Sequence, residues 1–266
     1  MHGHLGDGTI KKKNKYNLLA LKRDFKIKLA HYLACMGIFP SIYFVNNPFK
    51  IIEFFELFSD VKISKNDTIL DIGCGSGIQT LCIGTMCRHI TGIDVNCESL
   101  RSSKLFANIA RIDANFICTT IEEAKFPDDS FDKIISVCVI EHIPNYDETL
   151  REVFRTLKNG GEFILSVDSL QSIESNSLIL KHKSDHKVIR YFDAKELEML
   201  LSAIGFSNIK IHSIFKSDYA NDLFIQGIEN NFIFNNHYLI TYFIMKLHER
   251  RTKNSKGIFL IVKCKK

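Results

Sequence analysis

The sequence lacks several features that would narrow its class at once. It has no tryptophan and only four prolines among 266 residues. No apolar run reaches the roughly 20 residues that a bilayer-crossing helix needs, so no such helix is predicted. The eight cysteines show no closely spaced pairs, and Cys82 and Cys87 lack the second pair of ligands that a zinc site requires. With no secretory signal ahead of them, we expect reduced, mostly buried thiols and a cytoplasmic location.

Acidic side chains do not balance the basic ones near the ends of the chain. The net charge is +5. Much of it comes from lysines and arginines clustered near the two ends of the chain: Lys11, Lys12, Lys13, Lys15, Arg250, Arg251, Lys253, Lys256, Lys263, Lys265 and Lys266. Residues 1–17 have little apolar surface to bury and are predicted to form a mobile basic tail. Basic ends are usually solvated, and weak contact with nucleic acid or an anionic membrane surface is the alternative.

Residues 18–60 are predicted to form an N-terminal helical cap. Residues 18–36 follow a helical pattern with a basic face. The stretch NNPFKIIEFFELFS then predicts a helix with Asn47 as its cap and Pro48 in its first turn. Four apolar side chains recur in it at helical spacing and are expected to pack on the main domain: Ile51, Phe54, Phe55 and Phe58.

From residue 67 onward, short apolar strands alternate with helices. The predicted strands read TILDIG, HITGIDVN, ANFICTTI, KIISVCVI, EFILSVDS, FSNIKIHSIF and GIFLIVKC. Because such alternation builds a parallel sheet with helices on both faces, we predict a doubly wound α/β core over 61–216, completed by a final strand in 256–266. Residues 217–255 are expected to add two helices before that strand. Their apolar run at 238–247 favours a core helix, with a substrate lid or an interfacial helix touching lipid as the alternatives.

The stretch ILDIGCGSG at 69–77 places three glycines directly after a buried strand. A strand that enters a glycine-rich turn and then a helix is a nucleotide-binding arrangement, because a ligand can approach the bare backbone closely. The spacing of Gly73, Gly75 and Gly77 is G-x-G-x-G, with Ile78 where a dinucleotide fingerprint has its third glycine. No Lys-Ser or Lys-Thr follows the turn, so a P-loop is excluded.

An acid ends the second predicted strand. Asp94 closes TGIDV, 17 residues after Gly77. A carboxylate at this point can accept hydrogen bonds from both hydroxyls of a ribose, and a helix N-cap is the alternative role. The preceding glycine turn favours the ribose role.

With these features in place, the chain resembles the class I S-adenosylmethionine-dependent methyltransferases, in particular the group with the ubiquinone- and menaquinone-pathway enzymes. Four blocks carry the resemblance over about 45–213: ILDIGCGSG, ITGIDVN, FPDDSFDKIISVCVIEHI and REVFRTLKNGGEFILSV. The resemblance implies a Rossmann-like sheet of seven strands, mostly parallel with the last strand antiparallel. It also implies S-adenosylmethionine as methyl donor, bound over the first two strands and released as S-adenosylhomocysteine.

The resemblance also implies roles for individual residues. Gly73, Cys74 and Gly75 would pass under the methionine and ribose parts of the donor. Asp71 would reach the donor's amino group through water. Asp94 would hold the ribose, with Val95 against the adenine.

Further along the chain, the family often binds the adenine amino group with an acid after the third strand. Here Thr120 occupies that position, followed by Ile121 and Glu122, so either side chain or the backbone of Ile121 alone could take the role. Cys138 would line the methionine end. Glu141 and His142 would lie at the mouth, facing the acceptor.

Methyl transfer from a sulfonium is an in-line displacement, so an enzyme contributes mainly alignment and a dry pocket. If the acceptor is a hydroxyl, His142 is the candidate base, because its pKa lies near neutrality, while packing at a strand end is its other role. Glu141 with Asp147 could hold a divalent ion, as some quinone-pathway relatives are thought to do, but no metal is predicted.

Other acceptors and other functions fit less well. The fourth strand carries VCVIEH in place of the Asn/Asp-Pro-Pro-aromatic tetrad of nucleic-acid amino-methyltransferases, and NNPF at 46–49 lacks the second proline. No proline precedes a cysteine, so the nucleophile of a cytosine-C5 enzyme is absent. We therefore predict O- or C-methylation of a small, apolar or lipid-like acceptor. A nucleic-acid or protein methyltransferase and a non-catalytic donor-binding domain are the alternatives, and no oligomeric state is implied.

Overall fold

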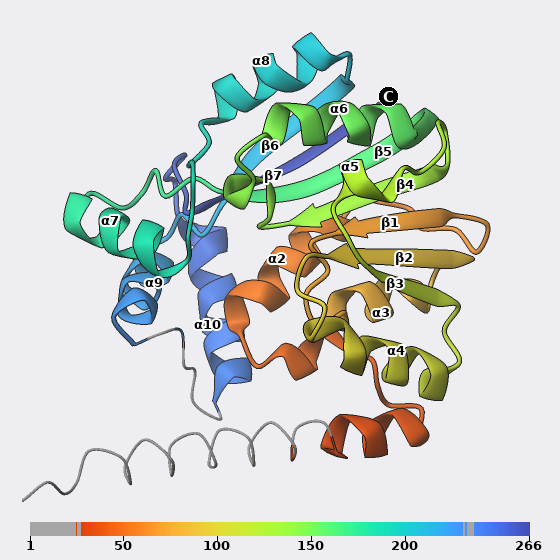
Figure 1. Ribbon diagram of the computed structural model, residues 1–266. Helices are drawn as coiled ribbons and strands as arrows, with labels where there is room; N and C mark the ends of the chain where they lie inside the picture. The colour runs from red at the N-terminus through yellow and green to blue at the C-terminus, as the bar shows by residue number, and fades with distance from the viewer. Residues whose placement is uncertain (1–24, 26–27, 231, 233–236) are drawn as a thin grey trace, which may run out of the picture.

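The computed structural model describes residues 25, 28–230, 232 and 237–266. The predicted basic tail at 1–17 and the start of the predicted N-terminal cap lie outside the described residues. Residues 28–35 are helical, in line with the pattern expected there. The strands and helices below carry the labels of Figure 1.

A seven-stranded sheet forms the centre of the described structure. Its strands are β1 (Thr68–Ile72), β2 (His89–Asp94), β3 (Ala114–Cys118), β4 (Phe131–Val137), β5 (Leu157–Asp168), β6 (Ser207–Ile214) and β7 (Phe259–Lys265). They lie in the order β3-β2-β1-β4-β5-β7-β6. β7 runs antiparallel to both neighbours, β5 and β6, whereas the pairs β1–β2, β2–β3, β1–β4 and β4–β5 are parallel. The predicted fold, with its antiparallel last strand, is confirmed.

Helices cover both faces of this sheet (Figure 1). One face carries α2 (Pro48–Phe58), α3 (Ile78–Gly84) and α4 (Ser99–Ala110), and the other carries α5 (Ile121–Ala124), α6 (Tyr146–Thr156) and α8 (Ala194–Ile204). β1 is buried almost throughout, because its side chains meet a separate apolar cluster on each face. Its continuous apolar sequence follows from that double burial.

The N-terminal cap docks through α2. As predicted, Asn47 caps the helix, its Oδ1 accepting hydrogen bonds from the backbone N–H groups of Phe49 and Lys50 at 3.0 and 3.4 Å. The predicted apolar face was wrong in one respect, because Phe55 is exposed. The helix is instead rotated so that the carboxylate of Glu53 is fully buried over the sheet. This rotation brings polar groups of α2 to the ends of β4 and β5.

The remaining helices lie at one end of the molecule. α7 (Asn176–Asp185), which the sequence did not predict, follows β5. The expected helices before the last strand are α9 (Asp218–Asn230) and α10 (Tyr238–Arg251), and α10 packs against α2 and α9. Two short 3₁₀ turns complete the set, η1 (Ile42–Val45) and η2 (Ile140–His142). No helix of the described residues is long and apolar enough to cross a membrane.

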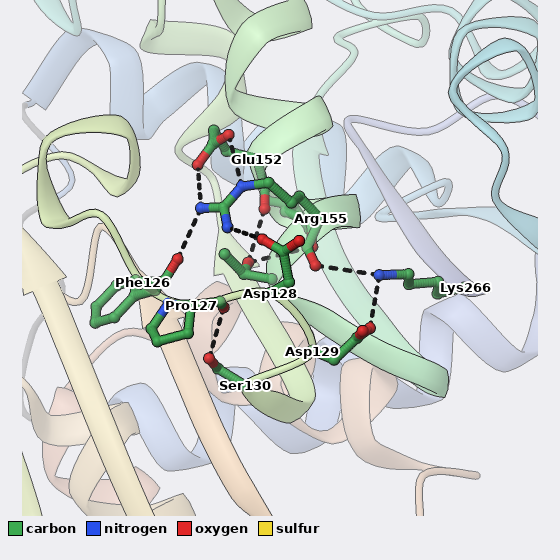
Figure 2. Close-up of polar contacts among 10 residues, drawn as sticks. Phe126, Pro127, Asp128, Asp129, Ser130, Glu152, Arg155 and Lys266 are labelled. Atoms are coloured by element: carbon green, nitrogen blue, oxygen red, sulfur yellow. Dashed lines mark hydrogen bonds and ion pairs between the residues drawn. The ribbon is translucent and has the colours of Figure 1, made fainter.

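The block FPDDSFD anchors the loop before β4, as Figure 2 shows. The guanidinium of Arg155 on α6 donates hydrogen bonds to the carbonyl of Phe126 at 2.8 Å and to Glu152 at 2.7 and 3.0 Å, and it also pairs with Asp128. The Lys266 ammonium donates to Asp129 at 2.8 Å and to the carbonyl of Arg155 at 3.1 Å. These acids lie at the amino end of β4, so this block stabilises the fold at the edge of the sheet opposite the carboxyl ends of the strands.

One expectation about the cysteines was wrong. Cys97 and Cys118 form a disulfide, with a Cα–Cα distance of 5.0 Å. Cys118 ends β3 and stands opposite Asp94 in the parallel register, so residues 21 apart in sequence meet at neighbouring strand ends. The other six cysteines carry free thiols, of which Cys82, Cys87 and Cys264 are buried as expected.

Candidate active site

A cavity of about 510 Å³ lies at the carboxyl ends of the central strands. It opens where β1 is flanked by β2 on one side and β4 on the other, the switch point at which doubly wound sheets bind ligands. Its walls come from the ends of β1 to β4 and the following turns: Ile72, Gly73, Ile93, Asp94, Val95, Thr119, Thr120, Ile121, Glu122, Cys138, Val139, His142, Ile143, Pro144 and Thr149. Seven of the predicted donor residues are among them.

The glycine turn brings bare backbone to this cavity. The N–H groups of Gly73 and Cys74 donate to the carbonyl of Ile93 at 2.8 and 3.0 Å, which fixes the turn against β2. Gly73 has φ +70°, and a Cβ at this position would lie 2.3 Å from Cγ2 of Val139. Gly75 has φ +54° and open space where its Cβ would be. Glycine is therefore required at Gly73 by both conformation and packing, and Gly75 leaves room for a ligand.

Asp94 is held rigidly beside that turn. Its Oδ2 accepts the N–H of Gly75 at 2.7 Å, and its Oδ1 accepts the N–H of Asn96 at 2.7 Å. The N-cap of α4 is Glu98, so the alternative role of Asp94 as that helix cap is wrong. Each carboxylate oxygen keeps a second lone pair, and those lone pairs can accept the two hydroxyls of a ribose.

The far end of the cavity fits a flat apolar ring. Val95 is 73% exposed, which is unusual for an apolar side chain at a strand end, and it lines the cavity. Opposite it, Thr120 Oγ1 accepts the N–H of Glu123 at 3.2 Å as the cap of α5. Glu122 accepts the hydroxyl of Thr149 on α6 at 2.5 Å. Glu122 thus keeps one carboxylate oxygen for a ligand.

Three predicted donor residues, Asp71, Cys74 and Gly75, are not among those that line the cavity. Asp71 is buried and accepts the hydroxyl of Thr80 at 2.6 Å. Burial, together with the nearby charge of Asp94, raises the pKa of Asp71 to about 7. Cys74 is not among the residues that line the cavity, and burial raises the pKa of its thiol. Asp71 and Cys74 support the turn, and a water-mediated contact of Asp71 with the donor stays a prediction.

A second cavity of about 220 Å³ adjoins the first, because Cys138 and His142 line both. Its other lining residues come from α2, α7, α9, positions directly beside these helices, and the ends of β5 and β7: Asn47, Phe49, Lys50, Asp168, His182, His186, Phe224, Phe232 and Phe259. None of these nine residues was predicted from the sequence to belong to the site. The second cavity is lined by both aromatic and polar side chains, and His182 and His186 lie in ring contact with Phe224 and Phe232.

Cys138 stands between the two cavities in a conformation that is rare for a non-glycine residue, with φ +51°. Its Sγ donates to Glu53 at 2.9 Å, and its N–H donates to the carbonyl of Ser166 at 3.0 Å. Glu53 also accepts the Ser166 hydroxyl at 2.5 Å and the Lys50 ammonium at 2.8 Å. This network fixes α2 to β4 and β5 and positions Cys138. Burial raises the pKa of Cys138 well above its usual value, so the thiol stays neutral.

His142, like Cys138, lines both cavities. Its Nδ1 lies 3.3 Å from the carbonyl of Lys187. Because a carbonyl only accepts, this contact places the proton on Nδ1 and leaves the lone pair on Nε2. Partial burial lowers the pKa of His142, so the ring is neutral near pH 7 and can accept a proton.

Glu141 does not lie where the sequence placed it. Its side chain is 1% exposed, lines neither cavity and accepts the N–H of Asp168 at 3.1 Å, so the expected position at the mouth was wrong. Its Oε2 is buried with no hydrogen-bond partner among the described residues. Burial and the neighbouring Asp168 raise the pKa of Glu141 well above its usual value.

The metal-binding pair considered in the sequence is not formed either. Asp147 lies on the exposed side of α6, where it pairs with Arg151 at 2.9 Å. The residues that come together around Glu141 are Cys138 and Asp168, whose ligand atoms all lie within 4.8 Å of one another. A thiol and two carboxylates could hold a divalent cation, although each is favoured in its protonated form here.

A chain of polar groups continues from Asp168 along the second cavity. His182 Nδ1 lies 3.0 Å from the hydroxyl of Tyr191, and its Nε2 lies 3.8 Å from Asp168 Oδ2. Burial, with a contribution from His186, lowers the pKa of His182 to about 4, so the ring is neutral. Burial also raises the pKa of Asp168 to about 7. The polar side chains of the second cavity can thus donate and accept protons and hydrogen bonds, and its histidines are neutral.

Together, the strand order, the glycine turn and the acid at the end of β2 are those of the class I methyltransferase fold. Residues 70–165 match the family model described as "Methyltransferase domain". The predicted resemblance is confirmed.

Known proteins of related sequence match over about half of the chain or less. The sterol 4-C-methyltransferase strm-1 of Caenorhabditis elegans is 28% identical over 135 residues, which are 50% of this chain and 39% of that protein. A ubiquinone biosynthesis O-methyltransferase of a Bradyrhizobium strain is 31% identical over 98 residues, 37% of this chain and 38% of the relative. The chain thus matches less than half the length of these relatives.

Solved structures match over more of the chain. The YcgJ protein of Bacillus subtilis superposes with a TM-score of 0.58 at 20% identity, covering 81% of this chain and 98% of its own. Phosphoethanolamine N-methyltransferase 2 of Haemonchus contortus, in complex with S-adenosyl-L-methionine, gives 0.57 at 17% identity and covers 82% and 57%. These similarities establish the fold.

Proposed function

We propose that the chain is an S-adenosylmethionine-dependent methyltransferase that methylates a small acceptor bound in the 220 Å³ cavity. The observation that carries the proposal is the contact between the two cavities. A donor in the larger cavity and an acceptor in the smaller one would meet beside Cys138 and His142, which line both. Gly73, Gly75 and Asp94 would hold the donor, and Glu122 or Thr120 would face its adenine.

When bound, the donor supplies an activated methyl group on a sulfonium, so the residues of the chain need only align the acceptor and remove its proton. Alignment requires the acceptor atom about 3 Å from the methyl carbon, in line with the sulfur–carbon bond. His142 Nε2 accepts the acceptor's proton. Phe49, Phe224 and Phe259 exclude water from this cavity and so lower the local dielectric. A low dielectric favours methyl transfer from the positively charged sulfonium to an acceptor oxygen that becomes negative as it loses its proton.

The residues that line the second cavity indicate what the acceptor looks like. Its four phenylalanines fit an apolar body, and Asp168, His182 and His186 fit a hydroxyl or another hydrogen-bonding group. A small molecule with an apolar frame and a reacting oxygen meets both requirements, and the cavity volume is that of a small molecule or of one end of a larger one. Of the relatives, the ubiquinone biosynthesis O-methyltransferase carries a name that agrees with a reacting oxygen, whereas the name of the sterol 4-C-methyltransferase gives methylation at carbon.

The test is a transfer assay with methyl-labelled donor and cell extract separated into aqueous, nucleic-acid, protein and organic fractions. With the organic fraction as acceptor source, label transfer and S-adenosylhomocysteine formation are expected to rise together. Both should persist after the fraction is treated with nuclease and protease. His142→Gln should lower kcat at least tenfold with little change in donor Kd, whereas His212→Gln, at an exposed histidine of β6, should change neither. Donor binding without transfer to any fraction would favour a non-catalytic domain, and label in nucleic acid or protein would contradict the acceptor class.

A further inference from the structure

One surface of the described structure has no function in the proposed reaction. α10 packs on α2 through Tyr242 and Met245, which are buried. Its opposite side carries a run of exposed apolar side chains, the α10 stripe: Leu239, Ile240, Phe243, Ile244 and Leu247. Their spacing of one, three or four residues places them on one side of the helix. A continuous apolar surface of this kind marks an interaction site.

The α10 stripe is enlarged by neighbouring aromatic rings. Tyr43 of η1 and Phe55 of α2 are exposed, and their ring centroids lie 5.9 Å apart. Tyr43 and Phe55 contact Tyr242 at 6.4 and 6.5 Å, and Tyr242 contacts Phe243 of the stripe at 5.0 Å. The apolar surface therefore extends across η1, α2 and α10, on the side of the sheet that carries α2 and opposite α6 and α8 (Figure 1).

The stripe ends in positive charge. Arg251 follows Leu247 by one helical turn, so it extends the same row, and Arg250, Lys253 and Lys256 lie close by in sequence and are exposed. Among the described residues, no carboxylate forms an ion pair with any of these four side chains. The one acid of the segment, Glu249, accepts the backbone N–H groups of Lys216 and Ser217 at 3.0 and 2.8 Å.

We infer that the α10 stripe docks the protein on the surface of an anionic lipid bilayer. Apolar side chains beside lysines and arginines are the pattern of interfacial helices, which bury one side among acyl chains and leave their cations at the phosphate level. α10 has 14 residues and is about 21 Å long, too short to span a bilayer, and its other side is committed to α2. It can therefore only lie on the surface.

A second copy of the chain is a poorer occupant for this surface. A two-fold contact through the stripe would bring the apolar side chains together. It would bring no free acid from α10 to Arg250 and Arg251, because Glu249 is already bonded to backbone N–H groups. The phosphates of a bilayer provide the missing negative charge.

Vesicle binding tests the inference directly. The full chain is mixed with vesicles of phosphatidylcholine alone or with 30% phosphatidylglycerol, at moderate salt, and the bound fraction is measured by sedimentation. We expect clear binding to the anionic vesicles and weak binding to the neutral ones. Ile240→Ser with Phe243→Ser should weaken binding about tenfold or more. Arg250→Gln with Arg251→Gln should weaken binding to anionic vesicles alone by a similar factor.

The matched control is Leu180→Ser with Met199→Ser, since Met199 is 64% exposed and Phe243 is 65% exposed, on unrelated surfaces. This pair should bind vesicles like the unmodified chain. Because the sequence contains no tryptophan, Phe243→Trp provides a second readout that does not depend on a destabilising change. Its emission should shift to shorter wavelength with anionic vesicles, and that of Met199→Trp should not.

Several results would overturn the inference. The inference would be overturned if the unmodified chain did not bind anionic vesicles, whether because a second copy or because another part of the chain covers the stripe. Vesicle binding that the stripe variants leave unchanged would overturn it too, and would assign the binding to another basic segment such as residues 1–17. A dimer in light scattering that the stripe variants convert to monomer, with no vesicle binding, would show a protein contact instead.

Discussion

Removing the carboxylate of Asp94 should strongly weaken donor binding while leaving the fold intact. The carboxylate accepts hydrogen bonds from the N–H groups of Gly75 and Asn96, both at 2.7 Å, and its remaining lone pairs face the cavity. Two hydroxyl hydrogen bonds to a carboxylate contribute about 1.5–3 kcal/mol each before the donor's own desolvation is counted. We therefore expect Asp94→Ala to weaken donor binding by roughly 3 kcal/mol, or roughly 100-fold in Kd.

The assay is titration calorimetry with S-adenosylmethionine and S-adenosylhomocysteine, beside thermal unfolding of the same samples. Asp94→Asn, which keeps one acceptor oxygen, should lie between the unmodified chain and Asp94→Ala. Asp113→Asn, at an exposed acid paired with His89, serves as control and should bind normally. If Asp94→Ala is folded and its Kd changes less than threefold, the assignment of this cavity to the donor is wrong.

Three further predictions follow from the same contacts. Gly73→Ala should destabilise the fold by about 1–3 kcal/mol, because it combines φ +70° with a clash against Val139, and adding Val139→Ala should recover part of the loss in thermal unfolding. Arg155→Ala should lower the free energy of unfolding by about 1–2 kcal/mol and leave the donor Kd unchanged. The control Arg151→Ala, which removes an exposed ion pair, should lower it by less than about 0.5 kcal/mol. Equal losses in the two variants would contradict the structural role of the FPDDSFD loop. His182 has its pKa lowered from 6.5 to about 4 in the fold, so the unfolded chain binds the extra proton, and stability that is fully present above pH 6.5 is lost as pH falls towards 4. As the pH falls through that window, the free energy of unfolding, measured with urea, should therefore drop by about 1–3 kcal/mol more for the unmodified chain than for His182→Gln. If the two free energies changed with pH in parallel, the burial of a neutral ring would be contradicted.

Most of the residues that line the larger cavity could be predicted to meet, because they are close to strand ends in the sequence. Gly73 and Gly75 follow the strand that they terminate, and Asp94 ends the next strand, so parallel pairing alone brings them to one edge. Val95 and Thr120 follow from the same rule at β2 and β3. The helix of Pro48 to Phe58 could be predicted for a similar reason, since Asn47 and Pro48 encode their roles within one turn.

The misplaced residues depend on geometry that spacing does not encode. Glu141 belongs to the short turn η2, which directs its side chain inward towards Asp168, so a residue next to His142 in sequence faces the opposite way. Phe55, expected on the packed face of α2, is exposed, and Glu53 is buried there because its polar partners, Cys138 and Ser166, hold the helix in this rotation. Cys97 and Cys118 meet only because the ends of β2 and β3 are neighbours.

The acceptor half is assembled from segments that are distant in sequence. Lys50 comes from α2, Asp168 from the end of β5, His182 from α7 and Phe224 from α9. Two of these had a readable signal. Asp168 ends a predicted strand just as Asp94 does, and His182 with His186 are four residues apart, the spacing of one helix face. The aromatic contributions had none, because phenylalanine is also the ordinary core residue of this chain.

This division has a consequence for how acceptor choice is encoded. The donor cavity is built almost entirely from strand ends and their turns, which the sheet fixes, so it can stay the same while the acceptor changes. The second cavity takes most of its wall from α2, α7 and α9, which lie outside the alternating strand and helix core. Exchanging Phe224 or His186 should therefore alter which acceptor is methylated with little effect on donor affinity, since neither side chain lines the donor cavity. A donor Kd that moved in parallel with acceptor KM in such variants would show that the two cavities act as one site.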